Sequence, residues 1–209
     1  MAQAAVKLGT TTIDEFDRIM EQAPEGADRY ELVDGHVVAM GNPTLIHEQI
    51  ASNIAAPLHT AVRPDGCSAI TGNMRVSATD DRSAKNKFKP DVLVRCGRVN
   101  TRDYVTDPVV IVEVLSPSTM DRDRGVKLEF YKQMPTIQHI VLAYADSPRI
   151  EHYFRTEEGW DREVLLAPEH VLRFAAVGFE IELEQIYLDV PFENAPRVWI
   201  DARGSNLTM

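Results

Sequence analysis

The stretch Val109-Val110-Ile111-Val112-Glu113-Val114-Leu115-Ser116 is a run of aliphatic, mostly β-branched residues with one carboxylate near its centre. Such a run is typical of a strand that is covered on both faces of its sheet. Because an isolated buried charge is very unfavourable, Glu113 must be paired, protonated or bound to a metal ion. The run therefore predicts a central strand, with Glu113 either in an internal ion pair with an arginine or in a metal site.

Two further groups make the metal site the more interesting hypothesis. The segment Pro90-Asp91-Val92-Leu93-Val94 predicts a second buried strand with an acid at its edge, and Lys127 falls on a helix expected over residues 121–134. Hard cations such as Mg²⁺ prefer oxygen ligands, usually one or two carboxylates with water in the remaining positions. Asp91 and Glu113 could hold such an ion, and the carbonyl of Val114 could add a third oxygen. Lys127 could then stabilise charge that develops on a phosphoryl group.

Simpler roles remain open for two of these residues. Asp91 follows a proline and could be a carboxylate at a strand end in solvent. Asp123 lies four residues before Lys127, a spacing that favours a surface ion pair on one helical face.

The rest of the chain predicts an α/β domain. Thr12 and Glu15 have the spacing of a capping box, so a short helix is expected to follow. Asp34-Gly35 joins two apolar runs as in a β-hairpin, and Thr44 can cap a helix that Pro57 should kink or end early. We expect a tail over residues 1–11 and one domain over residues 12–200, with a central mixed sheet flanked by helices.

Composition restricts the possible functions. The formal net charge of −10 argues against a protein that coats nucleic acid non-specifically, although a nuclease with an acidic metal site is compatible with it. No apolar run approaches the ~18 residues of a membrane span. The two cysteines, Cys67 and Cys96, lie far apart without a C-x-x-C motif, which favours reduced thiols and a cytoplasmic location.

The motifs around the two acids resemble those of the Uma-two family, a bacterial branch of the PD-(D/E)XK nuclease superfamily. The resemblance covers roughly residues 12 to 188. Its most specific part is the segment that runs from Glu113 to Thr119, followed by an aspartate and a lysine at the family's distance. The matching residues are Tyr30 to Gly35, His47, Lys89-Pro90-Asp91, Ile111 to Thr119, Asp121 to Gly125, Lys127, Leu128 and Tyr131.

The resemblance implies a restriction-endonuclease-like fold and a catalytic set. Asp91 and Glu113 would be the two acids, Lys127 the lysine, and Glu31 an acid that reaches the metal site from the first hairpin. The usual superfamily pattern has the lysine two residues after the second acid. That position is Leu115 here, so the lysine must come from the following helix.

Several matching residues keep a structural alternative. Glu31 could pair across the hairpin with His36 or with a nearby arginine, and His47 could be a packed, hydrogen-bonded histidine. Ser116 and Asp121 could cap the helix that carries Lys127, and Tyr131 would support Lys127 from behind.

Three hypotheses follow. The first is a Mg²⁺-dependent or Mn²⁺-dependent DNA endonuclease. The second is a module of the same fold that binds or regulates, acting with a partner that brings affinity for DNA. The third is a structural homodimer that pairs through an exposed strand edge, either over residues 149–155 or in the strand that contains Trp160.

Overall fold

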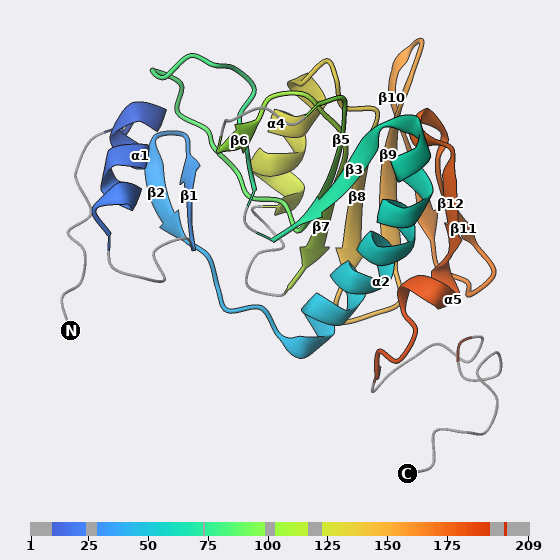
Figure 1. Ribbon diagram of the computed structural model, residues 1–209. Coiled ribbons are helices and arrows are strands. Elements are labelled where there is room, and N and C mark those ends of the chain that lie inside the picture. Colours follow the sequence, from blue (N-terminus) through green and yellow to red (C-terminus); the bar gives the residue numbers. More distant parts are fainter. Residues whose placement is uncertain are drawn as a thin grey trace.

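The computed structural model describes residues 10–23, 29–72, 74–98, 103–116 and 123–192, together with Trp199. At its centre is a six-stranded mixed sheet (Figure 1) with the strand order β10-β9-β8-β7-β5-β3. Neighbouring strands are antiparallel except β7 and β8, which are parallel. The six strands are β3 (Cys67–Thr71), β5 (Val92–Cys96), β7 (Pro108–Leu115), β8 (His139–Tyr144), β9 (Ile150–Thr156) and β10 (Gly159–Leu165).

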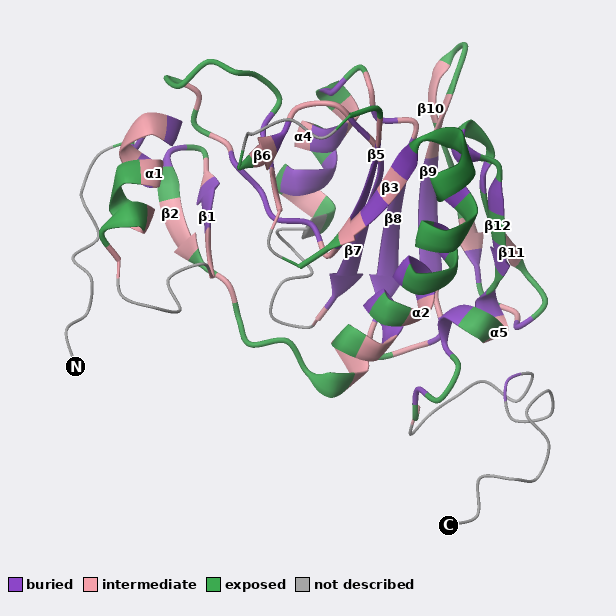
Figure 2. Cartoon of the chain, viewed as in Figure 1, coloured by how far each residue is buried: buried purple, intermediate pink, exposed green. Residues whose placement is uncertain are grey.

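Helices cover both faces of this sheet, as the apolar run predicts. The even-numbered residues Val110, Val112 and Val114 of β7 pack in one apolar cluster with helix α2 (Leu45–Val62). Ile111 and Leu115 pack in another cluster with helix α4 (Leu128–Gln133) on the opposite face. Because side chains alternate along a strand, Glu113 faces α4. The strands between the two helices are buried along most of their length (Figure 2).

Smaller elements surround the sheet. Helix α1 packs on the β1–β2 hairpin through Ile13, Phe16 and Leu32, and the β11–β12 hairpin and α5 pack beside α2. The bounds of these elements are α1 (Ile13–Glu21), β1 (Tyr30–Val33), β2 (His36–Ala39), 3-10 turn Arg63–Asp65, β4 (Arg75–Val76), β6 (Tyr104–Val105), π-helical turn Asp123–Lys127, β11 (Val171–Phe174), 3-10 turn Ala175–Val177, β12 (Phe179–Glu182) and α5 (Leu183–Ile186).

Most of the local sequence signals are confirmed. Thr12 caps α1 in a capping box with Glu15, and the Thr44 side chain accepts from the N–H of His47 at the start of α2. The Asp34-Gly35 turn has positive φ at both residues, 48° and 79°. Of the kink or early end expected at Pro57, the early end is wrong, and the kink stays a prediction. Helix α2 continues to Val62, because Leu58 and Val62 on its inner face are fully buried against the sheet.

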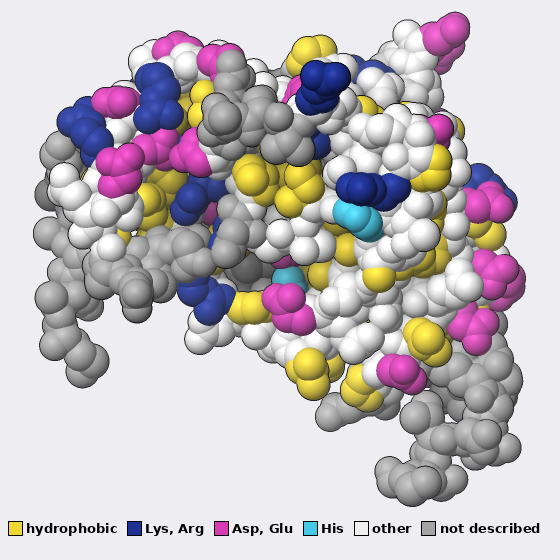
Figure 3. All heavy atoms as spheres, in the orientation of Figure 1, with side chains coloured by type: hydrophobic (Ala, Val, Ile, Leu, Met, Phe, Trp, Pro, Cys, Tyr) yellow, Lys and Arg dark blue, Asp and Glu magenta, His cyan; other side chains and the backbone are white. Residues whose placement is uncertain are grey.

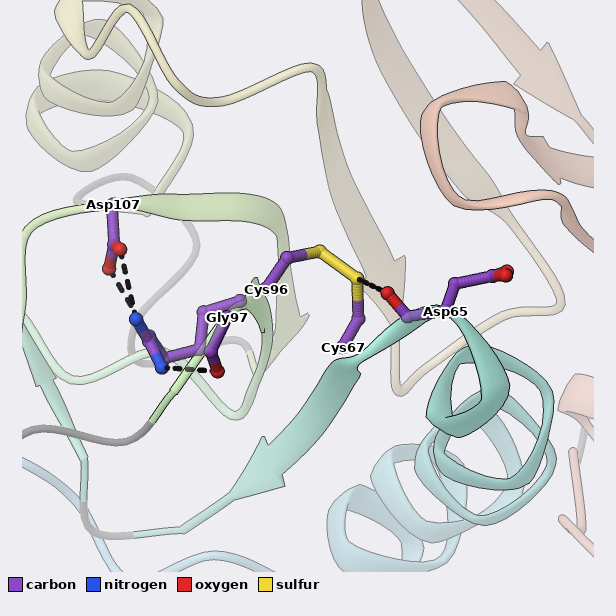
Figure 4. Close-up of a disulfide and its surroundings, with 6 residues drawn as sticks. Asp65, Cys67, Cys96, Gly97 and Asp107 are labelled. Carbon is purple, nitrogen blue, oxygen red and sulfur yellow. Dashed lines mark hydrogen bonds and ion pairs between the residues drawn. A yellow bond between two sulfur atoms is a disulfide. The ribbon is translucent and has the colours of Figure 1, made fainter.

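The reduced state expected for the cysteines is also wrong: Cys67 and Cys96 form a disulfide (Figure 4). They are direct register partners on the antiparallel strands β3 and β5, so their side chains leave the same face of the sheet. Their sequence separation of 29 conceals this proximity.

The strand order shows which of the two strands considered for pairing between subunits lies at an edge of the sheet. Strand β9 lies between β8 and β10, so residues 149–155 offer no free edge. Strand β10, which contains Trp160, is an edge strand as considered. Within the described residues no helix is long and apolar enough to cross a membrane. Of the tail expected over residues 1–11, residues 1–9 lie outside the described part of the chain. Thr11 belongs to the folded domain, because it is buried and donates its N–H to the Gly35 carbonyl.

Candidate active site

The buried carboxylate of Glu113 is bound by an ammonium group and a hydroxyl group from the helical segment that follows β7. Its carboxylate oxygens each lie 3.2 Å from Lys127 Nζ, and the Tyr131 hydroxyl donates to Oε1 at 2.7 Å. Glu113, Lys127 and Tyr131 are exposed by 3%, 2% and 0%. The partner of Glu113 is therefore a lysine rather than the arginine left open by the sequence. Tyr131 supports the glutamate directly instead of the lysine.

Lys127 reaches Glu113 because of the sheet topology. Two parallel strands such as β7 and β8 need a crossover connection, which usually contains a helix. Lys127 ends the π-helical turn Asp123–Lys127, within the crossover that starts at the carboxyl end of β7. Such π-helical turns are frequent at functional sites. Leu115, at the usual lysine position, is buried in the α4-side cluster, and Lys127 is buried rather than placed in a surface pair.

Glu31 joins the same cluster from strand β1. Its Oε1 lies 2.9 Å from Lys127 Nζ and accepts the backbone N–H of Lys89 at 2.8 Å. Its cross-strand neighbour is Val38, which explains why the pairing considered with His36 does not form. Oε2 of Glu31 is buried and has no hydrogen-bond partner among the described residues. Such an oxygen is costly unless another group binds it.

Asp91 lies at the start of β5, beside the same end of β7. Its Oδ2 accepts the N–H of Val114 at 2.7 Å and lies 3.3 Å from His47 Nε2. The side chains of Asp91 and His47 are 19% and 13% exposed, so Asp91 is not the solvated strand end that the sequence left open. Val114 is thus linked to Asp91 through its amide, and the role expected for its carbonyl remains a prediction.

The contacts of two groups at this site could not be predicted from the sequence. His47 matches the family pattern and lies one position after an apolar residue of α2, but only the fold reveals its contact with Asp91. The amide of Lys89 could not be found from residue type at all, because any backbone can supply it. Asp121 lies outside the described residues, so its capping role stays a prediction.

A cleft gives access to Asp91. It encloses about 430 Å³ between α2 and β3, and its lining includes His47, Ser52, Thr71 and Asp91. Ligand sites are commonly clefts of several hundred Å³. Of the acids at the site, Asp91 is the one that a molecule in this cleft could reach.

The Lys127 ammonium contacts two carboxylates of the cluster, those of Glu31 and Glu113, and Asp91 binds the backbone amide next to Glu113. The described residues contain no group of three or more acids, histidines or cysteines arranged to hold a metal ion by themselves. Mg²⁺, however, typically binds one or two carboxylates and keeps several waters. Glu31 Oε2, which has no hydrogen-bond partner among the described residues, fits such a cation.

Comparison with known proteins gives one family and one fold. The Uma2 family model, described as "Putative restriction endonuclease", matches residues 13–185. Two uncharacterized proteins of Synechocystis are similar: slr1290 is 26% identical over 79% of this chain and 86% of its own length, and sll1609 is 25% identical over 76% and 89%.

Among solved structures, the crystal structure of a "putative nuclease belonging to DUF820" from Anabaena variabilis superposes with a TM-score of 0.69 at 17% identity. The match covers 84% of this chain and 97% of that one. The restriction-endonuclease-like fold expected from the sequence is thereby confirmed.

Proposed function

Because the chain belongs to the Uma-two family of nucleases, we propose that it is a Mg²⁺-dependent or Mn²⁺-dependent endonuclease that hydrolyses phosphodiester bonds in DNA. The observation that carries the proposal is the buried Glu31–Lys127–Glu113 cluster at the carboxyl end of β7, with Asp91 hydrogen-bonded to the amide of the next residue, Val114. Buried carboxylates are expensive for folding unless other groups bind them. Glu31 Oε2, which is buried without a hydrogen-bond partner among the described residues, supports a role for these acids in holding a divalent cation.

Each residue has a role that follows from its contacts. Asp91 and Glu113 would hold the metal ion, with the Val114 carbonyl as a possible third oxygen ligand and Glu31 as an additional acid. The ion would supply Lewis acidity at the phosphate that is cut. Lys127 places a fixed positive charge beside Glu113, where it can stabilise negative charge on the phosphoryl oxygens. Tyr131 holds the Glu113 carboxylate in one orientation.

Cleavage of supercoiled plasmid DNA tests this proposal. Wild type should cut with Mg²⁺ or Mn²⁺ and not with EDTA, and Glu113→Gln should lose at least ~100-fold in rate, since one ligand of the cation and one partner of Lys127 change together. Glu129→Gln is the matched control, because Glu129 is an exposed acid on α4 that pairs with Lys132. Equal activity in wild type and Glu113→Gln, or no cleavage with any divalent ion, would refute the proposal.

A second candidate is a binding or regulatory module of the same fold that acts with a partner. The net charge of −10 favours it, because binding to DNA alone usually goes with basic excess. Calorimetric titration with Mn²⁺ separates the candidates: the enzyme requires an ion that binds in wild type and weakens in Glu113→Gln. A module without catalysis has no need of one.

The proposal includes two further expectations. We propose a homodimer, with β10 as the edge available for pairing, which light scattering would detect. We also propose a cytoplasmic location, because the DNA substrate would be found there; the Cys67–Cys96 disulfide removes the argument from reduced cysteines.

A further inference from the structure

A second buried acid, Glu151, lies on the α4 face of the sheet and is surrounded by positively charged side chains. Glu151 on β9 is fully buried, and it accepts hydrogen bonds from the Tyr144 hydroxyl at 2.7 Å and the Tyr153 hydroxyl at 3.0 Å. These hydroxyls and the nearby arginines favour the ionised carboxylate against burial, and the pKa of Glu151 is lowered overall. Glu151 is therefore a fixed negative charge.

Three arginines from three different elements surround this carboxylate. Guanidinium nitrogens lie 2.6 Å from it in Arg149, 3.1 Å in Arg124 and 3.7 Å in Arg162. Their side chains remain 38%, 41% and 51% exposed. One arginine would be enough to neutralise Glu151. Three arginines contact this one glutamate, and a guanidinium has five N–H donors, so donors remain for an outside ligand.

This arginine cluster lies next to the candidate active site. Glu113 pairs in register with Leu142 on β8, and Leu142 pairs with Glu151 on β9. Directly opposed residues share a face of a sheet, so both glutamates point toward α4, two strand spacings apart, or roughly 10 Å. Arg124 also lies only three residues before Lys127, in the same π-helical turn.

The two acids that flank Arg162 along β10 lie on the other face of the sheet. Asp161 and Glu163 are turned there by the alternation of side chains, and Glu163 accepts from His152 at 2.8 Å. On the face shown in Figure 3, Lys and Arg side chains occur in small groups among acidic ones rather than as a continuous stripe. On this acidic chain, the three arginines around Glu151 therefore form a small local basic site.

We propose that Arg124, Arg149 and Arg162 bind a phosphate of the nucleic-acid backbone that flanks the phosphate being cut. Planar guanidinium groups bind phosphate oxygens through paired N–H donors. Glu151, Tyr144 and Tyr153 are positioning residues that fix the orientation of the arginines. The inference rests on the proposed function, because it takes the polymer backbone as the ligand.

Fluorescence anisotropy with a labelled DNA duplex in EDTA measures this contact without cleavage. Arg162→Gln changes the most exposed of the three arginines, and Arg162→Lys keeps its charge. Arg173→Gln is the matched control, because Arg173 is an exposed arginine on β11 that pairs with Glu180. Thermal unfolding of each variant checks that the fold is intact.

The loss of one phosphate contact should reduce the slope of log K against log salt by about 0.9, which corresponds to roughly eightfold weaker binding at 0.1 M salt. Arg162→Gln should show this change, and Arg173→Gln should stay near wild type. Arg162→Lys should keep the wild-type salt slope because it keeps the charge, but it should bind more weakly than wild type because it lacks the paired N–H donors. Equal binding by Arg162→Gln and Arg173→Gln would overturn the inference, as would no binding by wild type at low salt.

Cleavage assays on the same variants separate this inference from the proposed function. If wild type binds DNA through Arg162 but cuts none with any divalent ion, the phosphate contact stands and the nuclease proposal fails. If wild type cuts DNA and Arg162→Gln binds and cuts as well as Arg173→Gln, the nuclease proposal stands and the phosphate contact fails.

Discussion

Replacing Lys127 by methionine should destabilise the protein far more than the loss of an ordinary ion pair. The Lys127 side chain is 3% exposed, and it is the ammonium that lies within 3.2 Å of both Glu31 and Glu113, which are 0% and 3% exposed. Methionine fills similar space without charge, so the two carboxylates would face each other in the interior. Removing one partner of a buried pair costs about 3–5 kcal/mol. The free energy of unfolding should fall by that amount.

Urea unfolding at neutral pH, followed by circular dichroism, measures this change. The double variant Lys127→Met/Glu31→Gln should recover at least about 1 kcal/mol of the loss, because one of the two facing charges is gone and contacting residues couple by that order. Lys132→Met is the control, since its ion pair with Glu129, whose side chain is 66% exposed, should be worth less than about 1 kcal/mol. If the free energy of unfolding of Lys127→Met lies within about 1 kcal/mol of the wild-type value, Lys127 does not neutralise a buried pair of acids. The contacts of Lys127 with Glu31 and Glu113 would then be wrong.

Three other changes test separate parts of the structure. Tyr131→Phe removes the hydroxyl that donates to Glu113 at 2.7 Å and should cost about 1–3 kcal/mol in urea unfolding, whereas no loss would contradict that bond. Burial, followed by the neighbouring His152, lowers the pKa of His139 from 6.5 to about 4. Protons therefore bind the unfolded chain more readily, so stability should fall by up to about 3 kcal/mol between pH 6.5 and 4, and His139→Gln should reduce this dependence. The Cys67–Cys96 disulfide closes a 29-residue separation, so thiol titration without reductant should find no free thiol and reduction should cost about 3–4 kcal/mol; two free thiols would refute the bond.

The parts of the fold that depend on local signals could be predicted from the sequence. Apolar periodicity placed the β7 strand, because a strand covered by α2 and α4 must be apolar on both faces. Capping residues and the Asp34-Gly35 turn also act locally, and they were found for that reason. The strand order and the isolation of each small hairpin from the central sheet depend on packing between distant segments, which one sequence does not encode in a local pattern.

The candidate site divides in the same way. The burial of Glu113 could be predicted from its apolar neighbours, and its need for a partner followed from the cost of a buried charge. The identity of that partner could not, because Lys127 approaches only through the crossover between parallel strands. Glu151 shows the limit more clearly. Its arginines come from residues 124, 149 and 162, and no spacing in the sequence indicates that they meet.

Crystals soaked in Mn²⁺ would test the proposed metal site most directly, because the anomalous signal of the ion locates it without reference to activity. We expect a peak within coordination distance of carboxylate oxygens of both Asp91 and Glu113, and its loss in crystals of Glu113→Gln. A peak that contacts neither acid, or no peak at a Mn²⁺ concentration that supports cleavage, would contradict the assignment of these residues as the metal ligands of a nuclease.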